Sequence, residues 1–280
     1  MVVSTAALPE PVLYTLPGGA QVGARTKGHG RAVLMLHGVG GAGASFWAQF
    51  ETFGDEFELI AWDAFGYGES SDPGDEPHLD DYADAAADLL DECGHKDAHV
   101  VGVSWGGVVA TRLALRHPKR VRTLALVSST YGRKNNEAVR DGFSSRIAAL
   151  EHDGVRAWAQ ARVDRQVSRR ASPELRRRIV DNATASVRLP GFTAATRTLA
   201  ETDHRPVLGA VQAPTIVLCG EDDEITGAPE SRVLADGIPG AEFLQVPGGG
   251  HVLNQDQFGV VNAALNRHWH LFDSHEVESM

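Results

Sequence analysis

The chain has 280 residues, of which 26 are Lys or Arg and 37 are Asp or Glu, so its net charge is −11. This length suffices for a large buried core, and the acidic balance argues against nucleic acid as a general partner. No apolar run is long enough to span a membrane, and the segment from Met1 to Pro11 lacks the charged and apolar regions of a secretory signal, so we expect a cytoplasmic protein that does not bind membranes.

Eight short apolar segments predict the strands of a sheet, and helical segments alternate with them along the chain. Most of these strands are continuous apolar runs, which indicates burial on both faces, as in parallel sheets. The alternation predicts an α/β fold with a mostly parallel, doubly wound, eight-stranded sheet. The strand segments are Val12 to Leu16, Gln21 to Thr26, Ala32 to Leu36, Phe57 to Trp62, Ala98 to Val103, Val121 to Val127, Thr215 to Cys219 and Glu242 to Val246.

Between Ser128 and Pro214 the alternation stops, and the chain shows only helical spacing with polar faces. We interpret residues 131–206 as a helical lid inserted into a core built from residues 1–130 and 207–280. This insert is basic, with 15 Arg plus Lys against 9 Asp plus Glu from Tyr131 to Pro206. Its expected helices are Asn136 to Gly154, Val155 to Val167, Pro173 to Ser186 and Phe192 to Asp203.

The segment Gly102-Val103-Ser104-Trp105-Gly106-Gly107 follows a predicted buried strand and precedes a helical stretch. A strand that turns this sharply into a helix forces its serine into a strained conformation, and small residues two positions before and after leave the room that it needs. The pattern predicts a nucleophile elbow that exposes the Ser104 hydroxyl.

A serine hydroxyl needs a general base, because an alcohol is a poor nucleophile at neutral pH. His251 is the best-placed histidine, since it lies in a glycine-rich loop after the last strand, at the sheet edge where catalytic groups gather. The acid that orients it is expected after the strand that ends at Cys219. Four acidic residues compete there, and we choose Asp223, with Asp222 as the alternative.

The loop after the third strand, His37-Gly38-Val39-Gly40, is expected to supply an oxyanion donor. The backbone N–H of Val39 is the first choice, with Gly40 as an alternative, and the second donor is the N–H of Trp105 at the start of a helix. We expect His37 to be a structural hydrogen-bonding residue and not a base.

Together these segments resemble the α/β-hydrolase superfamily over nearly the whole chain. The resemblance rests on His37-Gly38, the run from Asp63 to Ser70, the elbow, the run from Gly220 to Asp223, and Gly250-His251, in that order. It implies an α/β-hydrolase fold and a Ser-His-Asp triad. A serine at position 104 argues against the dehalogenase and epoxide-hydrolase branches, whose nucleophile is a carboxylate.

Within the superfamily, the lid and tail are most similar to the 3-oxoadipate enol-lactonase group, through stretches such as Arg146 to Leu150 and His251 to Leu265. Two departures are Phe65, where many members carry arginine, and Trp105, where methionine or leucine is common. We therefore expect a serine hydrolase that cleaves a carboxylic ester or lactone through an acyl-enzyme. The alternatives are a carbon-carbon bond hydrolase of a vinylogous diketone and, third, a non-hydrolytic catalyst or binding protein on the same scaffold.

The basic lid suggests that arginine binds a carboxylate of a small-molecule substrate. No cofactor is expected, and no metal either, because Cys93 and Cys219 lie outside any C-x-x-C spacing and His268 and His270 face different sides of a helix. The residues considered for substrate contact are Arg146, Arg162, Arg188, His204 and Arg205.

Overall fold

The computed structural model describes residues 8–133 and 137–277 and contains one eight-stranded sheet. Its strand order is β1-β2-β4-β3-β5-β6-β7-β8, with β1 and β2 antiparallel to their neighbours and every later pairing parallel. This is the mostly parallel sheet predicted from the sequence. The strands are β1 (Val12–Thr15), β2 (Gln21–Lys27), β3 (Arg31–Leu36), β4 (Phe57–Asp63), β5 (Ala98–Val103), β6 (Val121–Val127), β7 (Thr215–Gly220) and β8 (Glu242–Val246).

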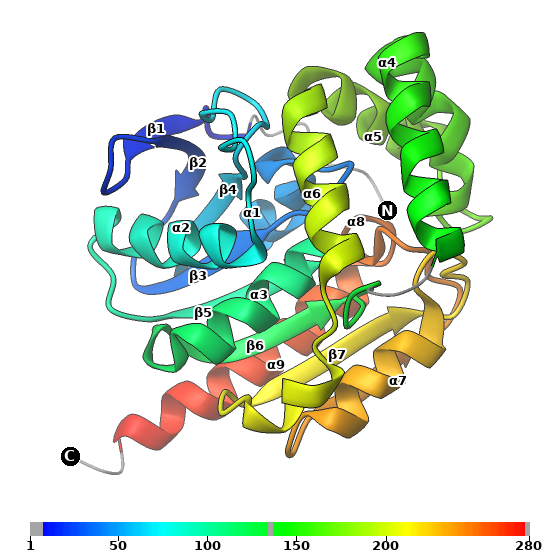
Figure 1. Cartoon of the computed structure of the whole chain (residues 1–280). Helices are drawn as coiled ribbons and strands as arrows, with labels where there is room; N and C mark the ends of the chain where they lie inside the picture. The colour runs from blue at the N-terminus through cyan, green and yellow to red at the C-terminus, as the bar shows by residue number, and fades with distance from the viewer. Residues whose placement is uncertain (1–7, 134–136, 278–280) are drawn as a thin grey trace.

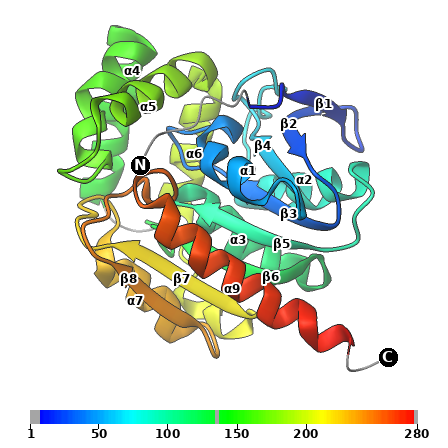
Figure 2. The same cartoon turned by 180° about the vertical axis from the view of Figure 1, so that it is seen from behind.

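Helices cover both faces of the sheet (Figures 1 and 2). The helices α2 (Leu79–Glu92), α3 (Trp105–Arg116) and α7 (Gly227–Gly237) pack on one face, and α1 (Trp47–Phe53) and α9 (Phe258–Val277) pack on the other. Successive residues of a strand point to opposite faces, so a strand between two helical layers needs apolar residues at every position. In β3, for example, Leu34 and Leu36 belong to the first core and Val33 and Met35 to the second.

Among the described residues, three α-helices lie between β6 and β7 in the chain, and we call them the lid helices: α4 (Glu137–Gln166), α5 (Pro173–Ser186) and α6 (Leu189–Glu201). The helix α4 is interrupted at Gly154, whose φ of 78° and ψ of 162° are not helical. The interruption falls where the sequence predicts one helix to end and the next to begin. Asn136, the expected first residue of this pair, lies outside the described residues.

The remaining helical segments are short and lie in the connections: η1 (Gly43–Phe46), η2 (Pro118–Arg120), η3 (Arg205–Ala210) and α8 (Leu253–Asp256). Among the residues that the structure describes, no helix combines the length and the apolar character needed to cross a bilayer.

The parallel strands β3, β5, β6, β7 and β8 are neighbours in the sheet, so their carboxyl ends lie along one edge. The loops that follow these ends carry every residue predicted for catalysis. The lid helices rise from the same edge (Figure 1), which places the candidate site between sheet and lid.

Candidate active site

Ser104 lies in a tight turn between β5 and α3, with φ of 54° and ψ of −118°, a strained conformation for a residue with a side chain. A methyl group on Gly102 would lie 2.5 Å from Gly107 Cα, and one on Gly106 would lie 2.0 Å from the Leu36 carbonyl oxygen. The two glycines are therefore needed because backbone segments touch there. The turn is held by hydrogen bonds from Ser104 N–H to the Val127 carbonyl (2.9 Å) and from Gly107 N–H to the Ser104 carbonyl (3.0 Å).

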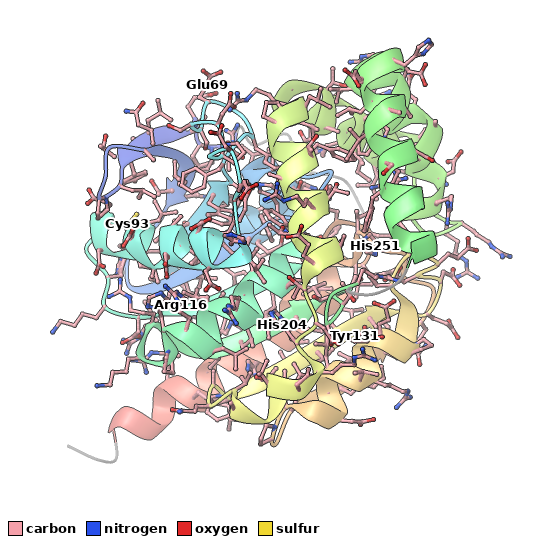
Figure 3. The ribbon with its side chains drawn as sticks, viewed as in Figure 1. Glu69, Cys93, Arg116, Tyr131, His204 and His251 are labelled. Carbon is pink, nitrogen blue, oxygen red and sulfur yellow. The ribbon has the colours of Figure 1, made fainter. Side chains whose placement is uncertain are left out.

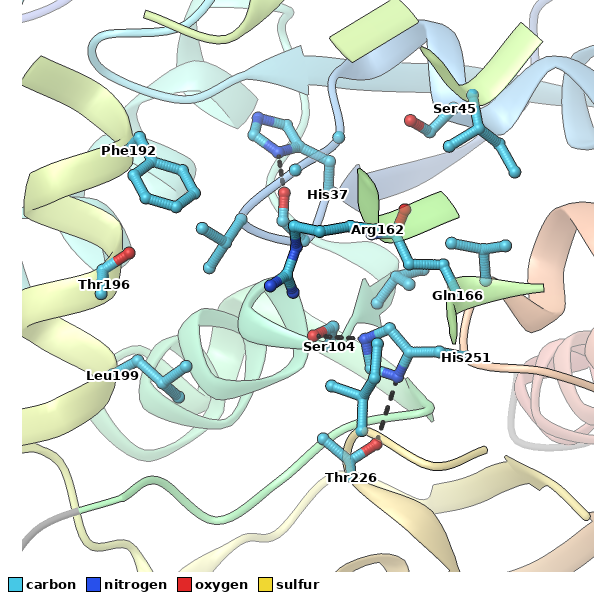
Figure 4. A pocket seen from close by; sticks show the side chains of 18 of the residues that line it. His37, Ser45, Ser104, Arg162, Gln166, Phe192, Thr196, Leu199, Thr226 and His251 are labelled. Atoms are coloured by element: carbon cyan, nitrogen blue, oxygen red, sulfur yellow. Dashed lines mark hydrogen bonds between the residues drawn. The ribbon is translucent and has the colours of Figure 1, made fainter. Parts of the chain in front are cut away.

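The structure brings Ser104, His251 and Asp223 together, and Figure 4 shows the contact between Ser104 and His251. His251 Nε2 is 3.0 Å from Ser104 Oγ, and its Nδ1 is 3.0 and 3.1 Å from the two Asp223 carboxylate oxygens. An ionised carboxylate only accepts hydrogen bonds, so Nδ1 carries the proton and Nε2 is free to accept the serine proton. This is the geometry that activation of a serine nucleophile requires.

The Asp223 carboxylate is positioned by its own loop. It accepts hydrogen bonds from the backbone N–H groups of Ile225 (2.9 Å) and Thr226 (3.2 Å), and the Thr226 hydroxyl lies 2.7 Å away. Burial alone would raise the pKa of Asp223, but the hydrogen bond and charge of His251, with these loop donors, outweigh it and hold the pKa well below its usual range. Asp222, the alternative acid, is exposed. The sequence did not single out Thr226, although it lies three residues after the predicted acid.

The peptide between Gly38 and Val39 is held in place through its carbonyl group. The Gly38 carbonyl accepts hydrogen bonds from Gly41 N–H (2.9 Å) and His37 Nδ1 (2.8 Å; Figure 4). Ala64 N–H donates to His37 Nε2 (3.1 Å), which assigns the proton to Nδ1 and makes His37 a neutral structural residue. Burial lowers the pKa of His37, which favours the same neutral form.

This loop passes directly over Ser104, since a methyl group on Gly38 would lie 3.1 Å from Ser104 Cβ. Trp105 is the first residue of α3, where backbone N–H groups have no partner within the helix. The predicted donors Val39 and Trp105, with Gly40 as the alternative, thus lie in the two segments that flank Ser104.

A cavity of about 270 Å³ lies above Ser104 and His251. Its floor comes from the loops at the sheet edge and its walls come largely from the lid helices. A cavity of this size fits a small molecule. The lid residues that line it include Phe143, Arg146, Trp158, Arg162, Gln166, Ile179, Phe192, Thr196 and Leu199.

A family model described as the alpha/beta hydrolase fold matches residues 31–256, which is most of the chain. The chain belongs to the α/β-hydrolase family of enzymes. Among related sequences, the hydrolase is 30% identical over 236 residues to a protein of Yersinia enterocolitica named as carbamate hydrolase RutD, covering 81% of this chain and 84% of that one. It is 32% identical over 238 residues to the pimeloyl-[acyl-carrier protein] methyl ester esterase of Chromobacterium violaceum, covering 81% and 89%.

Solved structures agree with this family. A malate-bound thermophilic esterase from Thermogutta terrifontis has a TM-score of 0.85 and 27% identity, and the match covers 94% of this hydrolase and 99% of the esterase. An enol-lactonase from Burkholderia xenovorans has a TM-score of 0.84 at 19% identity, covering 92% and 99%. At 19% identity, the similarity to the enol-lactonase shows only that the two proteins share a fold.

Trp105 has a second contact in this α/β hydrolase that the sequence did not predict. Its indole Nε1–H donates to Thr198 Oγ1 of lid helix α6 (3.1 Å), and its ring packs edge-on against Tyr82 at 5.0 Å. The side chain is fully buried. The residue that departs from the common pattern after the nucleophile therefore ties the elbow to the lid.

Of the five residues considered for substrate contact, the structure brings two to the cavity, Arg146 and Arg162. Arg188 instead binds Asp72 and the Ser70 carbonyl at the surface. Arg205 pairs with Asp203 (2.7 Å) and stacks 4.9 Å from the Tyr131 ring centroid.

His204 is buried at the end of the lid, beside Tyr131 (Figure 3), and its backbone N–H donates to the Tyr131 carbonyl (2.8 Å); it does not line the cavity. Neither of its ring nitrogens has a hydrogen-bond partner among the described residues. Burial lowers the pKa of His204 to about 4. We therefore treat it as a buried neutral side chain that affects stability.

Within residues 8–133 and 137–277, no group of three or more His, Cys, Asp or Glu side chains is placed to hold a metal ion.

Proposed function

We propose that this hydrolase cleaves a carboxylic ester or lactone by transferring the acyl group first to Ser104 and then to water. The observation that carries the proposal is the chain of contacts from Ser104 Oγ through His251 to Asp223, with distances of 3.0 Å at both steps. Relatives that are named as hydrolases and esterases support the same reaction class.

In the first half-reaction, Ser104 Oγ attacks the carbonyl carbon while His251 Nε2 takes the serine proton. The carbonyl oxygen becomes an oxyanion that accepts hydrogen bonds from the N–H groups of Val39 and Trp105, each of which typically contributes about 3 kcal/mol. Collapse of this intermediate breaks the bond to the alcohol oxygen, and His251 gives that oxygen the proton. The products are the acyl-enzyme and a free alcohol, which remains part of the acyl chain when the substrate is a lactone.

In the second half-reaction, His251 removes a proton from water, and the resulting hydroxide attacks the acyl-enzyme. The intermediate collapses to a carboxylic acid, and Ser104 regains its proton from His251. Asp223 stabilises the imidazolium that forms at each step. In this proposal, α4 to α6 act as the lid that separates the reaction from bulk water.

The test is a panel of 4-nitrophenyl esters, lactones and a vinylogous diketone, measured with the wild type and with Ser104→Ala. We expect the wild type to hydrolyse esters or lactones, and the variant to lose at least ~10³-fold in kcat. Turnover of the diketone without turnover of esters and lactones would instead assign carbon-carbon bond cleavage. Undiminished ester hydrolysis by Ser104→Ala would contradict the acyl-enzyme.

A further inference from the structure

Two arginines project from the lid into the cavity without a carboxylate to bind. Arg146 and Arg162 lie on opposite sides of the interruption of α4 at Gly154. Among the described residues, each guanidinium group lies over an aromatic ring, Phe143 for Arg146 and Trp158 for Arg162, with the guanidinium carbon 5.3 Å from the ring centroid. In the part of the chain that the structure describes, neither guanidinium has an ion pair.

Other arginines of the lid helices show that carboxylate partners are available nearby. Arg156 pairs with Asp181 at 2.7 Å, and Arg176 pairs with Asp164 at 2.9 Å. Arg133 is a third arginine that lines the cavity, but it pairs with Glu230 at 2.7 Å.

As a result, the described lining of the cavity carries an excess of positive charge. Its described lining contains these three arginines and no Asp or Glu, and only Arg133 is neutralised by a partner. Arg146 and Arg162 are half-buried, and burial with mutual repulsion lowers the pKa of Arg162 to about 10. Charges taken out of water without a partner are costly, so an anion that enters the cavity would be stabilised there.

The direction of Arg162 fixes where the anion would lie. Its guanidinium points into the cavity over Ser104 (Figure 4), so an anion bound to it lies close to the reacting carbonyl. The remaining wall, with Trp158, Phe192 and Leu199, is apolar and suits a short carbon chain.

We propose that Arg146 and Arg162 bind a carboxylate of the substrate, so that the preferred substrates are small esters or lactones whose acyl part carries a free acid. This inference rests on the proposed hydrolysis at Ser104. The planar guanidinium of arginine matches a carboxylate with paired hydrogen bonds, which a neutral ester of equal size cannot form.

The test compares two 4-nitrophenyl esters of equal length, one with an acyl chain that ends in a carboxylate (glutarate) and one that ends in a carboxamide. We expect kcat/KM of the wild type to favour the carboxylate ester by about 10- to 100-fold. Arg162→Gln and Arg146→Gln should each remove much of this preference, because each should lower kcat/KM for the carboxylate ester more than for the carboxamide ester. Arg177→Gln is the matched control, since it removes the same charge from an exposed position of lid helix α5 and should leave the preference unchanged.

Equal rates on the two esters in the wild type would overturn the inference while leaving the proposed hydrolysis intact. An equal loss on both esters in Arg162→Gln would also overturn it, because it would show that Arg162 acts on the reacting carbonyl.

Binding can be measured without catalysis by titrating glutarate into Ser104→Ala in a calorimeter. We expect binding that weakens with salt and is lost in Ser104→Ala combined with Arg162→Gln. Glutarate binding of this kind in an enzyme that hydrolyses neither ester would support the arginine site and refute the proposed hydrolysis. Absence of glutarate binding, or equal binding in the double variant, would refute the arginine site.

Discussion

Replacing Gly106 with alanine should damage both stability and catalysis, because the added methyl group meets the backbone of β3. It would lie 2.0 Å from the Leu36 carbonyl oxygen, 2.5 Å from the Leu36 carbonyl carbon and 2.7 Å from the His37 carbonyl oxygen, whereas ordinary contacts begin near 3.4 Å. The strand β3 is paired on both sides, with β4 and β5, and cannot yield. The start of α3 must therefore move by about 1 Å.

That displacement moves the Trp105 N–H away from the loop that carries Val39, so the two proposed oxyanion donors no longer converge. Misplacing a reacting group by ~1 Å costs roughly 10²-fold in rate, and overpacking typically costs about 1–3 kcal/mol of stability, with backbone clashes at the upper end. We therefore expect kcat/KM for an ester to fall roughly 10²-fold. The free energy of unfolding in guanidinium chloride should fall by about 1–3 kcal/mol.

Gly259→Ala is the matched control, because a methyl group there meets nothing within 4 Å at the start of α9. It should leave the rate unchanged and increase stability by about 0.5–1 kcal/mol. If Gly106→Ala keeps the wild-type unfolding free energy and a kcat/KM within about threefold, the close approach of α3 to β3 does not position the elbow as described.

Three further predictions concern other parts of the site and its supports. Asp223→Asn should lower kcat by about 10⁴-fold, because His251 is no longer held with its proton on Nδ1. A loss of less than about tenfold would refute the role of Asp223. Thr198→Val should lower the free energy of unfolding in urea by about 1–3 kcal/mol, because it leaves the Trp105 indole N–H buried without an acceptor. Thr198→Ser keeps the hydroxyl and should retain most of the wild-type stability, so equal losses in both variants would contradict this hydrogen bond. Burial lowers the pKa of His204 to about 4 in the folded state, against about 6.5 when unfolded, so on acidification the unfolded state binds this proton first. Between pH 6.5 and 4, the free energy of unfolding of the wild type should therefore fall by ~1.4 kcal/mol per pH unit more than that of His204→Gln. Parallel stability curves for the two proteins would show that His204 does not titrate in this way.

The sheet could be predicted from the sequence because its strands are buried on both faces and read as continuous apolar runs, as in β3 and β5. The bounds of α2 and α5 agree with those predicted, Leu79 to Glu92 and Pro173 to Ser186. The three residues proposed as the catalytic triad lie in loops after strands of one sheet, so fold topology alone brings those loops to one edge. Their order along the chain was therefore sufficient to predict that they meet.

Contacts that depend on how a lid helix is rotated could not be predicted in the same way. The helix α4 has polar residues on most of its surface, and nothing in its spacing shows that Arg146 and Arg162 turn inward while Arg156 pairs with Asp181. These directions follow from the interruption at Gly154 and from packing against α5 and α6, which are tertiary effects. The same holds for the bond between Trp105 and Thr198, which joins residues 93 positions apart.

The central claim is that Ser104 is the activated nucleophile, and covalent labelling tests it most directly. The protein should react with a fluorophosphonate probe, and peptide mass spectrometry should locate one adduct on the peptide that contains Ser104. The label should be absent in Ser104→Ala and form far more slowly in His251→Gln, because the general base is missing. Failure of the wild type to react under conditions that label other serine hydrolases, or an adduct on another residue that persists in Ser104→Ala, would contradict the account.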